Sequence, residues 1–376
     1  MNVVEHLGLV GLPNAGKTSL FNALTGAHAP VAPHPFTTTE TKSGAALLPD
    51  SRVEALAEMS RSRKVVHASV EVVDIAGLVA GSSSGEGLGN RFLAGIREVD
   101  ALCLVLRAFE DPEVAGEVEP VEALGVLELE LVLADLASLE TQLERRRKAA
   151  RVAKGDRSLE AEVAAWDRAH AALSDGVPLY RAGLTADEMA LLVPAFLLTA
   201  KPVIAVVNLG EDQLGKADAI VDPVVEHLSG QEGPGSAEGE LGAPSALAAC
   251  VQLEAEAAEL GAGERAEMLE GLGLGEGALA RVARSAYHVL GRRTFLTTGE
   301  KETRAWSFRE GSTAPVCAGV IHSDLQRGFI RAEVVHWDKL IEAGSWSAAK
   351  SEGRIRLEGK EYVVQDGDVL EIRFNV

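Results

Sequence analysis

Short apolar runs alternate with helical stretches over the first hundred residues of this 376-residue chain. Residues 6–10, 70–74 and 101–106 have the length and composition of buried strands. The same pattern returns at residues 202–208, and residues 246–250 are one further candidate strand. Strands that alternate with helical segments are typical of a parallel sheet, so the pattern predicts an α/β domain.

A different pattern begins at residue 121. Apolar residues there step by three and four along the chain, which predicts a coiled-coil seam: Leu129, Val132, Leu136, Leu139 and Leu143. A second helix is expected to follow the turn at residues 155–156 and to run through Trp166. Because the strand pattern resumes after Lys201, the two helices are predicted to form an antiparallel hairpin inserted into the α/β domain.

The pattern changes again near residue 293. Short alternating strands, such as residues 304–308 and 367–374, predict a small mixed α/β module. The chain is therefore expected to divide into three parts. These are an α/β domain at residues 1–120 and 200–292, a helical insertion at 121–199, and a C-terminal module at 293–376.

Composition narrows the class of protein. The chain is 47% hydrophobic and 24% charged, and no apolar run approaches the roughly 20 residues of a membrane span. We therefore expect no membrane partner, no signal peptide and a cytoplasmic location. The formal charge of −20 argues against a protein that coats nucleic acid indiscriminately. DNA is therefore not expected as a partner, and an RNA partner would need a local basic patch.

Residues 11–18 read Gly-Leu-Pro-Asn-Ala-Gly-Lys-Thr, a complete G-x-x-x-x-G-K-[ST] phosphate-binding loop between a candidate strand and a candidate helix. Backbone N–H groups of such a loop can surround a phosphate at the positive end of the helix. Lys17 is expected to reach the β- and γ-phosphate oxygens, and the Thr18 hydroxyl is expected to bind Mg²⁺. The sequence thus predicts a site for a nucleoside triphosphate.

Two further segments indicate a GTPase-type switch. Asp74-Ile-Ala-Gly77 ends a candidate strand as a D-x-x-G motif, in which Asp74 can hold a Mg²⁺-bound water and the Gly77 N–H can approach the γ-phosphate. The loop at residues 29–42 is rich in Pro and Thr, and Thr38 is the residue expected to reach Mg²⁺. The two segments follow the phosphate loop in the order typical of a GTPase-type switch. The predicted catalytic residues are therefore Lys17, Thr38, Asp74 and Gly77.

The element that would read the base departs from the guanine-binding N-K-x-D sequence. A candidate strand ends in Asn208-Leu-Gly-Glu211. Leu209 stands in place of the Lys that covers guanine, and Glu211 stands in place of the Asp that accepts from its N1 and N2 groups. Without the hydrogen-bonding geometry of that Lys and Asp, the site no longer selects guanine. Adenine loses fewer favourable contacts by this change. The sequence therefore predicts ATP as the nucleotide, with GTP as the alternative.

Positive charge is concentrated near the tip of the expected hairpin, on Arg145, Arg146, Arg147, Lys148, Arg151, Lys154 and Arg157. Such a run can be a solvated helix end or a surface for an anionic partner. In a chain this acidic, both interpretations stay open.

Motifs along the whole chain resemble the YchF branch of the Obg-related P-loop ATPases, the Obg-like ATPases. They are GLPNAGKTSLFNALT from residue 11, HPFTTTE from 34, VDIAGLVAGSSSGEGLGNRFL from 73, RAFED from 107, KPVIAVVNLGED from 201, ETRAW from 302, IHSDLQRGFIRAEV from 321 and YVVQDGDVLEIRFNV from 362. The resemblance implies a P-loop GTPase-type domain with an inserted coiled-coil hairpin and a C-terminal TGS domain of β-grasp shape. It also implies slow ATP hydrolysis and association with the ribosome, as 50S or 70S particle, and its RNA.

The resemblance also assigns site residues. It places nucleotide contacts on Asn14, Ala15, Gly16, Lys17, Thr18 and Ser19, metal ligands on Thr18 and Thr38, and base contacts on Asn208, Leu209 and Glu211. One departure concerns hydrolysis. Leu78 stands where many GTPases have Gln, and residues 110–116 lack the His that related proteins carry after the R-x-F-E motif. We therefore expect slow hydrolysis and unaffected nucleotide binding.

Three functions stay open at this point. The first is a Mg²⁺-dependent ATP-hydrolysing switch that associates with the ribosome and regulates translation or a stress response. The second is a GTPase of the same fold. The third is a nucleotide-stabilised ribosome-binding scaffold with negligible hydrolysis.

Overall fold

The computed structural model describes residues 5–27, 41–75, 88–111, 118–153, 155–229 and 245–375. Thr38, Gly77 and Leu78 lie outside these ranges, as does Lys154. The chain forms two compact units, one of residues 5–45 and 71–290 and the other containing residues 46–70 and 291–375. Within the described ranges, every helix is too short or too polar to cross a membrane.

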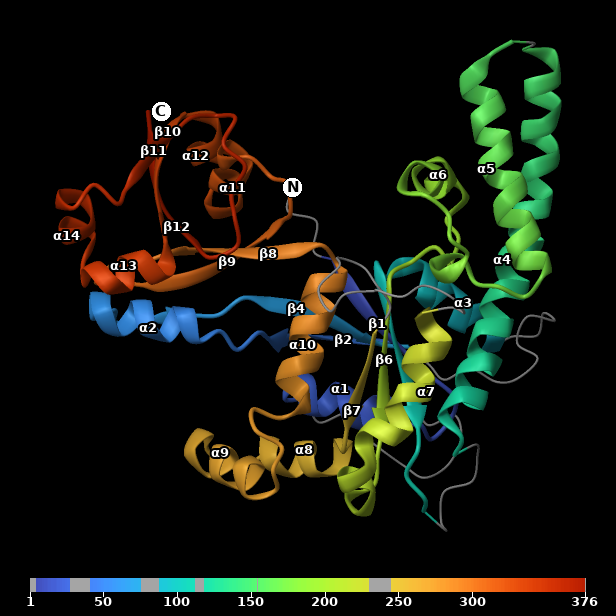
Figure 1. Ribbon diagram of the computed structural model, residues 1–376, viewed down its shortest axis with the longest axis horizontal. Helices are drawn as coiled ribbons and strands as arrows, with labels where there is room; N and C mark the ends of the chain where they lie inside the picture. The colour runs from blue at the N-terminus through green and yellow to red at the C-terminus, as the bar shows by residue number, and fades with distance from the viewer. Residues whose placement is uncertain are drawn as a thin grey trace. The chain divides into compact units, whose positions relative to one another are not determined.

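The larger unit is built on a six-stranded sheet in the order β2-β4-β1-β5-β6-β7 (Figure 1). The strand pairs from β4 through β7 are all parallel, and β5 and β6 are buried along their whole length. Burial on both faces explains why these strands are continuous apolar runs in the sequence. The strands are β1 (His6–Val10), β2 (Lys42–Leu47), β4 (Ser69–Asp74), β5 (Ala101–Arg107), β6 (Val203–Asn208) and β7 (Ser245–Ala249). All five predicted strands of this sheet are confirmed to within one residue.

Helices cover both faces of this sheet (Figure 1). On one face α3, α4 and α7 pack on the strands through residues such as Ile96, Leu127 and Val224. On the other face α10 contacts β5, β6 and β7 and also packs against α1. Besides α4, the helices of this part are α1 (Lys17–Thr25), α3 (Leu88–Glu98), η4 (Glu211–Lys216), α7 (Ala217–Ser229), α8 (Val251–Ala258), α9 (Ala262–Gly271) and α10 (Ala278–Val289).

The predicted helical hairpin is present as α4 (Pro120–Val152) and α5 (Arg157–Ser174), which lie side by side in Figure 1. Leu139 and Leu143 of α4 pack with Trp166 of α5 in a shared apolar cluster. One predicted seam position is wrong, because Leu129 is 53% exposed. Since α5 is much shorter than α4, the first turns of α4 face the sheet instead of a partner helix. The short helices η2 (Leu179–Arg181), α6 (Ala186–Leu192) and η3 (Val193–Ala195) lead back to β6.

Two buried carboxylates anchor the base of the hairpin. Glu128 of α4 accepts hydrogen bonds from the Tyr180 hydroxyl (2.5 Å) and Arg181 (2.7 Å), and it pairs with His227 of α7 (2.8 Å). About two helical turns further on, Asp135 accepts from the backbone N–H groups of Leu198 (2.8 Å) and Thr199 (2.7 Å) and from the Thr199 hydroxyl. Buried carboxylates require such partners. They therefore hold α4 in one position against the α/β core.

The smaller unit contains a mixed six-stranded sheet in the order β11-β10-β12-β8-β9-β3. Helix α11 covers it through Ala314, Cys317 and Ala318, which pack on Phe295 and Phe308. Its elements are α2 (Ser51–Ser60), β3 (Val65–Val66), β8 (Arg292–Thr297), β9 (Thr303–Arg309), α11 (Ala314–Ile321), α12 (Ser323–Arg327), β10 (Phe329–His336), α13 (Trp337–Ala343), α14 (Trp346–Ser351), β11 (Arg356–Glu358) and β12 (Asp368–Phe374).

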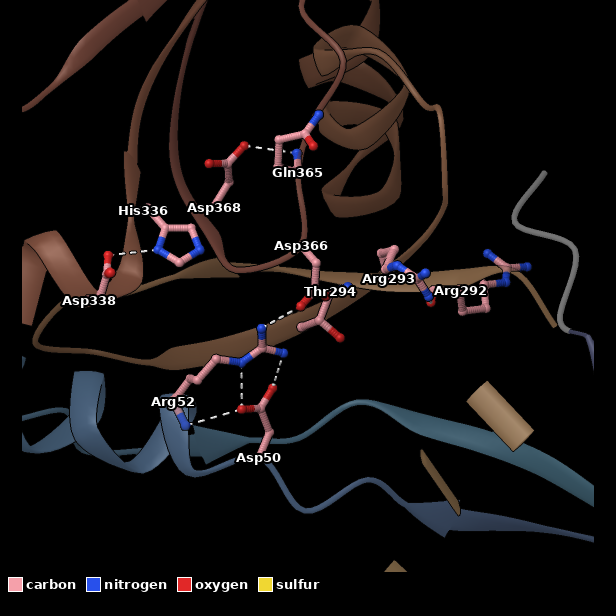
Figure 2. Close-up of polar contacts among 10 residues, drawn as sticks. All are labelled: Asp50, Arg52, Arg292, Arg293, Thr294, His336, Asp338, Gln365, Asp366 and Asp368. Atoms are coloured by element: carbon pink, nitrogen blue, oxygen red, sulfur yellow. Dashed lines mark hydrogen bonds and ion pairs between the residues drawn. The ribbon is translucent and has the colours of Figure 1, made fainter. Parts of the chain in front are cut away.

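Residues 46–70 belong to this smaller unit, whereas the sequence analysis assigned them to the α/β domain. The reason is their pairing: β3 extends the sheet beside β9, and the Ser62 hydroxyl donates to the Gly299 carbonyl (2.7 Å). Arg52 of α2 adds a polar link (Figure 2). Its guanidinium donates to Asp50 and to Asp366 (2.6 Å), and Asp366 in turn accepts from the Thr294 N–H (2.8 Å). The limits of the helical insertion stay a prediction.

Candidate functional site

The phosphate-binding loop connects β1 to α1 and requires two unusual backbone conformations. Gly16, directly before α1, has φ +94°, and Asn14 has φ +63°. Glycine adopts positive φ freely, and Asn tolerates it better than most residues. Gly11 has a different role, because a Cβ atom at this position would lie 2.5 Å from the Val105 carbonyl oxygen of β5. The motif glycines therefore let the loop lie directly against the sheet.

Lys17 is buried beneath the phosphate-binding loop. Its ammonium donates hydrogen bonds to the carbonyl oxygens of Gly11 (3.0 Å) and Leu12 (2.9 Å). Burial lowers the pKa of Lys17 to about 8, and the nearby Asp74 carboxylate opposes this shift. The side chain is thus still a cation at neutral pH. Two neutral carbonyl oxygens hold the ammonium group. Charged phosphate oxygens can replace them, because they accept stronger hydrogen bonds.

Thr18 and Asp74 meet beside Lys17. The Thr18 hydroxyl donates to Asp74 Oδ2 (2.7 Å), although the two residues come from α1 and the end of β4. Burial raises the pKa of Asp74, against the effects of the Thr18 hydrogen bond and of the lysines nearby. The other oxygen, Oδ1, is buried and has no hydrogen-bond partner among the described residues. An unpaired buried carboxylate oxygen next to a hydroxyl is suited to a cation or its water.

Asn208, the last residue of β6, connects the phosphate loop to the opposite side of the site. Its amide nitrogen donates to the Ala15 carbonyl (3.1 Å), and its amide oxygen accepts from the Val251 N–H at the start of α8 (3.2 Å). A Cβ atom on residue 16 would overlap this amide nitrogen. Asn208 is predicted from the sequence to contact the base, whereas in the structure its side chain supports the phosphate-binding loop.

A pocket of about 590 Å³ opens beside Asn208, at the carboxyl ends of β5, β6 and β7. Gly16, Ser19 and Glu211 of the predicted site residues line it. Leu209 also contributes to the wall, but it is only 2% exposed and packs into the core below. Its side chain therefore offers far less surface to a base than the lysine of an N-K-x-D element would.

Three residues around this pocket are not among those predicted from the sequence. Phe109 lines it after β5, where the Arg107 guanidinium stacks on its ring at 4.7 Å. Gln213 ties the two neighbouring loops together by accepting from the Gly210 N–H (2.8 Å) and donating to the Ala108 carbonyl (2.9 Å). Gln252 lines the pocket from α8. All three follow the carboxyl end of a parallel strand, which is where ligands bind in such sheets, and that position was the available signal.

Two family models match separate parts of the chain. Residues 6–135 match the model of 50S ribosome-binding GTPases. Residues 293–375 match a C-terminal model of YchF GTPases, which is described as a protein of unknown function.

Full-length relatives are also similar to this chain. It is 42% identical over 374 residues to the ribosome-binding ATPase YchF of Bacillus subtilis strain 168, which covers 98% of this chain and 99% of the relative. It is 40% identical over 372 residues to the ribosome-binding ATPase YchF of Escherichia coli O157:H7, with the same coverage. The solved structure of the Schizosaccharomyces pombe YchF GTPase has a TM-score of 0.81 at 30% identity and covers 98% of each chain. The predicted fold class is therefore confirmed.

Substitution of Gly16 tests the contact between the phosphate loop and Asn208. Gly16→Ala should weaken ATP binding by about thirtyfold, because the Asn208 amide must leave two hydrogen bonds of about 1 kcal/mol each. Gly26→Ala is the matched control at the other end of α1, since Gly26 has φ +66° and no atom of the described residues within 4 Å of its Cβ position. Both substitutions place an alanine at positive φ, which strains the backbone. Titration with a fluorescent ATP analogue measures both variants, and equal affinities would show that the contact is irrelevant to binding.

Proposed function

Because this chain belongs to the YchF family, we propose that it is a Mg²⁺-dependent ATPase that acts as a nucleotide switch on the ribosome in the cytoplasm and regulates translation or a stress response. One observation carries the nucleotide part of the proposal. Asn208 of the N-L-G-E element joins the phosphate loop to the pocket that Glu211 lines, so triphosphate and base would be bound by one continuous site.

The residues present fit a magnesium ion. Thr18 supplies a hydroxyl oxygen, and Asp74 supplies a buried carboxylate with the unpaired oxygen Oδ1. Hydroxyl and carboxylate oxygens are ligands that Mg²⁺ takes in triphosphate sites, often through water. We propose Thr18 as a direct ligand, Asp74 as the holder of a bound water, and Thr38 as the second direct ligand. When bound, the ion neutralises charge that develops on the β- and γ-phosphate oxygens.

The chain's own residues would bind and orient the triphosphate. Backbone N–H groups of residues 14–19 would surround the β-phosphate at the start of α1, where the helix dipole favours negative charge. Lys17 would exchange the Gly11 and Leu12 carbonyls for β- and γ-phosphate oxygens. Gly77 is proposed to donate its N–H to the γ-phosphate. Phe109 and Glu211 would face the base from the walls of the pocket.

Two alternatives differ in nucleotide or in chemistry. A GTPase of the same fold is suggested by the name of the fission yeast structure and by the N-terminal family model. A nucleotide-stabilised scaffold that hardly hydrolyses would explain the absence of His from residues 110–116. Competition between ATP and GTP tests the first alternative, and single-turnover hydrolysis tests the second.

Glu211 is the cleanest position for the test of nucleotide preference. In the wild-type chain ATP should bind at least as tightly as GTP. Glu211→Asp should shift the preference towards GTP by several-fold, because it restores the shorter carboxylate of a guanine site. Leu209→Lys is less suitable, since Leu209 is buried and the change would place a charge in the core. Glu226→Asp on the exposed surface of α7 is the matched control. Competition titrations measure the preference, and tighter GTP binding by the wild type would contradict the ATPase assignment.

The hairpin is the proposed contact with ribosomal RNA of the 50S or 70S particle. The structure divides its cations into two groups. Arg146 pairs with Glu162 (2.7 Å) and stacks on Trp166, and Arg147 pairs with Asp167 (2.6 Å), so both stabilise the hairpin. Arg145, Lys148, Arg151 and Arg157 are exposed and form no ion pair within the described part of the chain. The second group is available for phosphate oxygens.

Charge reversal of the available group tests this contact. Arg145→Glu, Lys148→Glu and Arg151→Glu together should weaken ribosome binding by about tenfold or more and lower its salt dependence, because each lost phosphate contact removes released counterions. The control combines Arg63→Glu, Lys216→Glu and Lys301→Glu, three exposed positions outside α4 and α5 with the same change in net charge. Ribosome pelleting over a salt series measures both. Equal pelleting of the two triple variants would exclude the hairpin as the contact.

Turnover of the isolated protein should be slow. Lys17, Thr18 and Asp74 would bind phosphate and metal, but none of them is suited to orient the attacking water. In related phosphoryl transfer, supply of the missing orienting or charge-stabilising group accelerates hydrolysis by about 10³–10⁵. We expect well under about one turnover per second without a partner and faster hydrolysis with ribosomes. Single-turnover measurements with and without ribosomes check this, and Lys17→Ala is the inactive control. Fast hydrolysis by the protein alone would mean that another residue aligns the water.

A further inference from the structure

One side-chain amide in the nucleotide pocket has an acceptor that no group in the described part of the chain uses. Two such amides line the pocket, Asn208 and Gln252. Both polar atoms of Asn208 are engaged, with Ala15 and Val251. Gln252 lies in the first turn of α8, is exposed, and makes one side-chain hydrogen bond among the described residues. Its carbonyl oxygen Oε1 is therefore available to a ligand.

Glu256 determines which way the Gln252 amide is turned. The amide nitrogen Nε2 of Gln252 donates to Glu256 Oε1 at 3.2 Å, one helical turn further along α8. An ionised carboxylate can only accept hydrogen bonds, so it holds the NH₂ group on its own side and excludes the flipped amide. The Gln252 carbonyl oxygen is consequently the atom left to face another partner.

Most of the polar side chains that line the pocket are hydrogen-bond acceptors. The Val251 N–H, a donor at this end of the pocket, is already used by Asn208. Among the described lining residues none is Lys, Arg or His, and six are carboxylates: Glu110, Asp111, Glu211, Asp212, Glu256 and Glu259. This end of the pocket therefore fits a ligand group that donates hydrogen bonds.

Adenine and guanine differ at position 6 of the purine ring in whether they donate or accept a hydrogen bond. Adenine has an amino group there, which donates, whereas guanine has a carbonyl oxygen, which accepts. We propose that Gln252, oriented by Glu256, is a specificity-determining residue that accepts a hydrogen bond from the N6 amino group of adenine and disfavours the O6 atom of guanine. This inference rests on the proposed ATP site and adds a second discriminating contact to Glu211, which faces the N1 and N2 edge of a guanine.

Two nucleotide analogues vary the substituent at position 6 of the base. Purine riboside triphosphate lacks any substituent there, and inosine triphosphate carries the oxygen without the N2 group of guanine. The wild type should bind ATP about three- to tenfold more tightly than purine riboside triphosphate, as expected for one hydrogen bond. Inosine triphosphate should bind more weakly still, because its oxygen would face acceptors. In Gln252→Ala the ratio of ATP to purine riboside triphosphate should fall to about twofold or less, with purine riboside triphosphate unaffected.

A pair of Glu-to-Gln variants tests the role of Glu256 as a positioning residue. Glu256→Gln should lower the same ratio, because a second amide no longer fixes the orientation of Gln252. Glu267→Gln is the matched control, since it makes the same change on an exposed carboxylate of α9 that is not among the residues lining the pocket. Its ratio should equal that of the wild type. Thermal unfolding midpoints show whether each variant is folded.

The outcomes separate this inference from the proposed function. If Gln252→Ala weakens ATP and purine riboside triphosphate equally, or leaves their ratio unchanged, Gln252 does not read position 6 and the inference is wrong. ATP preference over GTP would then still support the ATPase. Tighter binding of GTP by the wild type would instead overturn the ATP site itself, and the inference with it.

Discussion

The candidate site depends on the Asn208 side chain more than on any other single group. Asn208 ends β6, a strand buried at every residue, so its position is fixed by the core. From there its amide bonds the phosphate loop at Ala15 on one side and the start of α8 at Val251 on the other. The contact is possible only because Gly16 has no Cβ atom that would occupy the space of the amide. The phosphate-binding loop and the pocket beside it are thereby connected through one side chain.

The two ends of this site have opposite electrostatic character. Beside the phosphate-binding loop, Lys17 and the N-terminus of α1 present positive charge, and the buried carboxylate of Asp74 has an oxygen without a hydrogen-bond partner among the described residues. At the base end, the lining is dominated by carboxylates and holds no basic residue among those described. A ligand with an anionic tail and a hydrogen-bond-donating head matches this arrangement. ATP, with its triphosphate and its 6-amino group, has that distribution.

The hairpin is held to the α/β core by polar contacts and not only by apolar packing. Glu128 and Asp135 are buried on α4, and each is satisfied by groups from other segments, including His227 of α7 and the backbone at Thr199. Losing one partner would leave a buried charge unpaired, which is costly, so the angle of α4 is strongly constrained. Toward the tip, Arg146 and Arg147 stiffen the pair of helices by pairing across to α5. The remaining cations are thus presented on a rigid arm.

The sequence by itself determined the local features: the five predicted strands of the larger sheet, the phosphate loop, the helical hairpin and the altered N-L-G-E element. These depend on hydrophobic periodicity and on backbone geometry within a few residues, which a sequence displays directly. Only the tertiary structure decided that Asn208 supports the loop at Gly16, that Leu209 is buried, and that Gln252 has an available acceptor. It also decided that residues 46–70 pack with the C-terminal module. The physical reason is that strand order in a parallel sheet brings together residues as distant as Ala15 and Asn208, 193 positions apart, and no local pattern encodes that order.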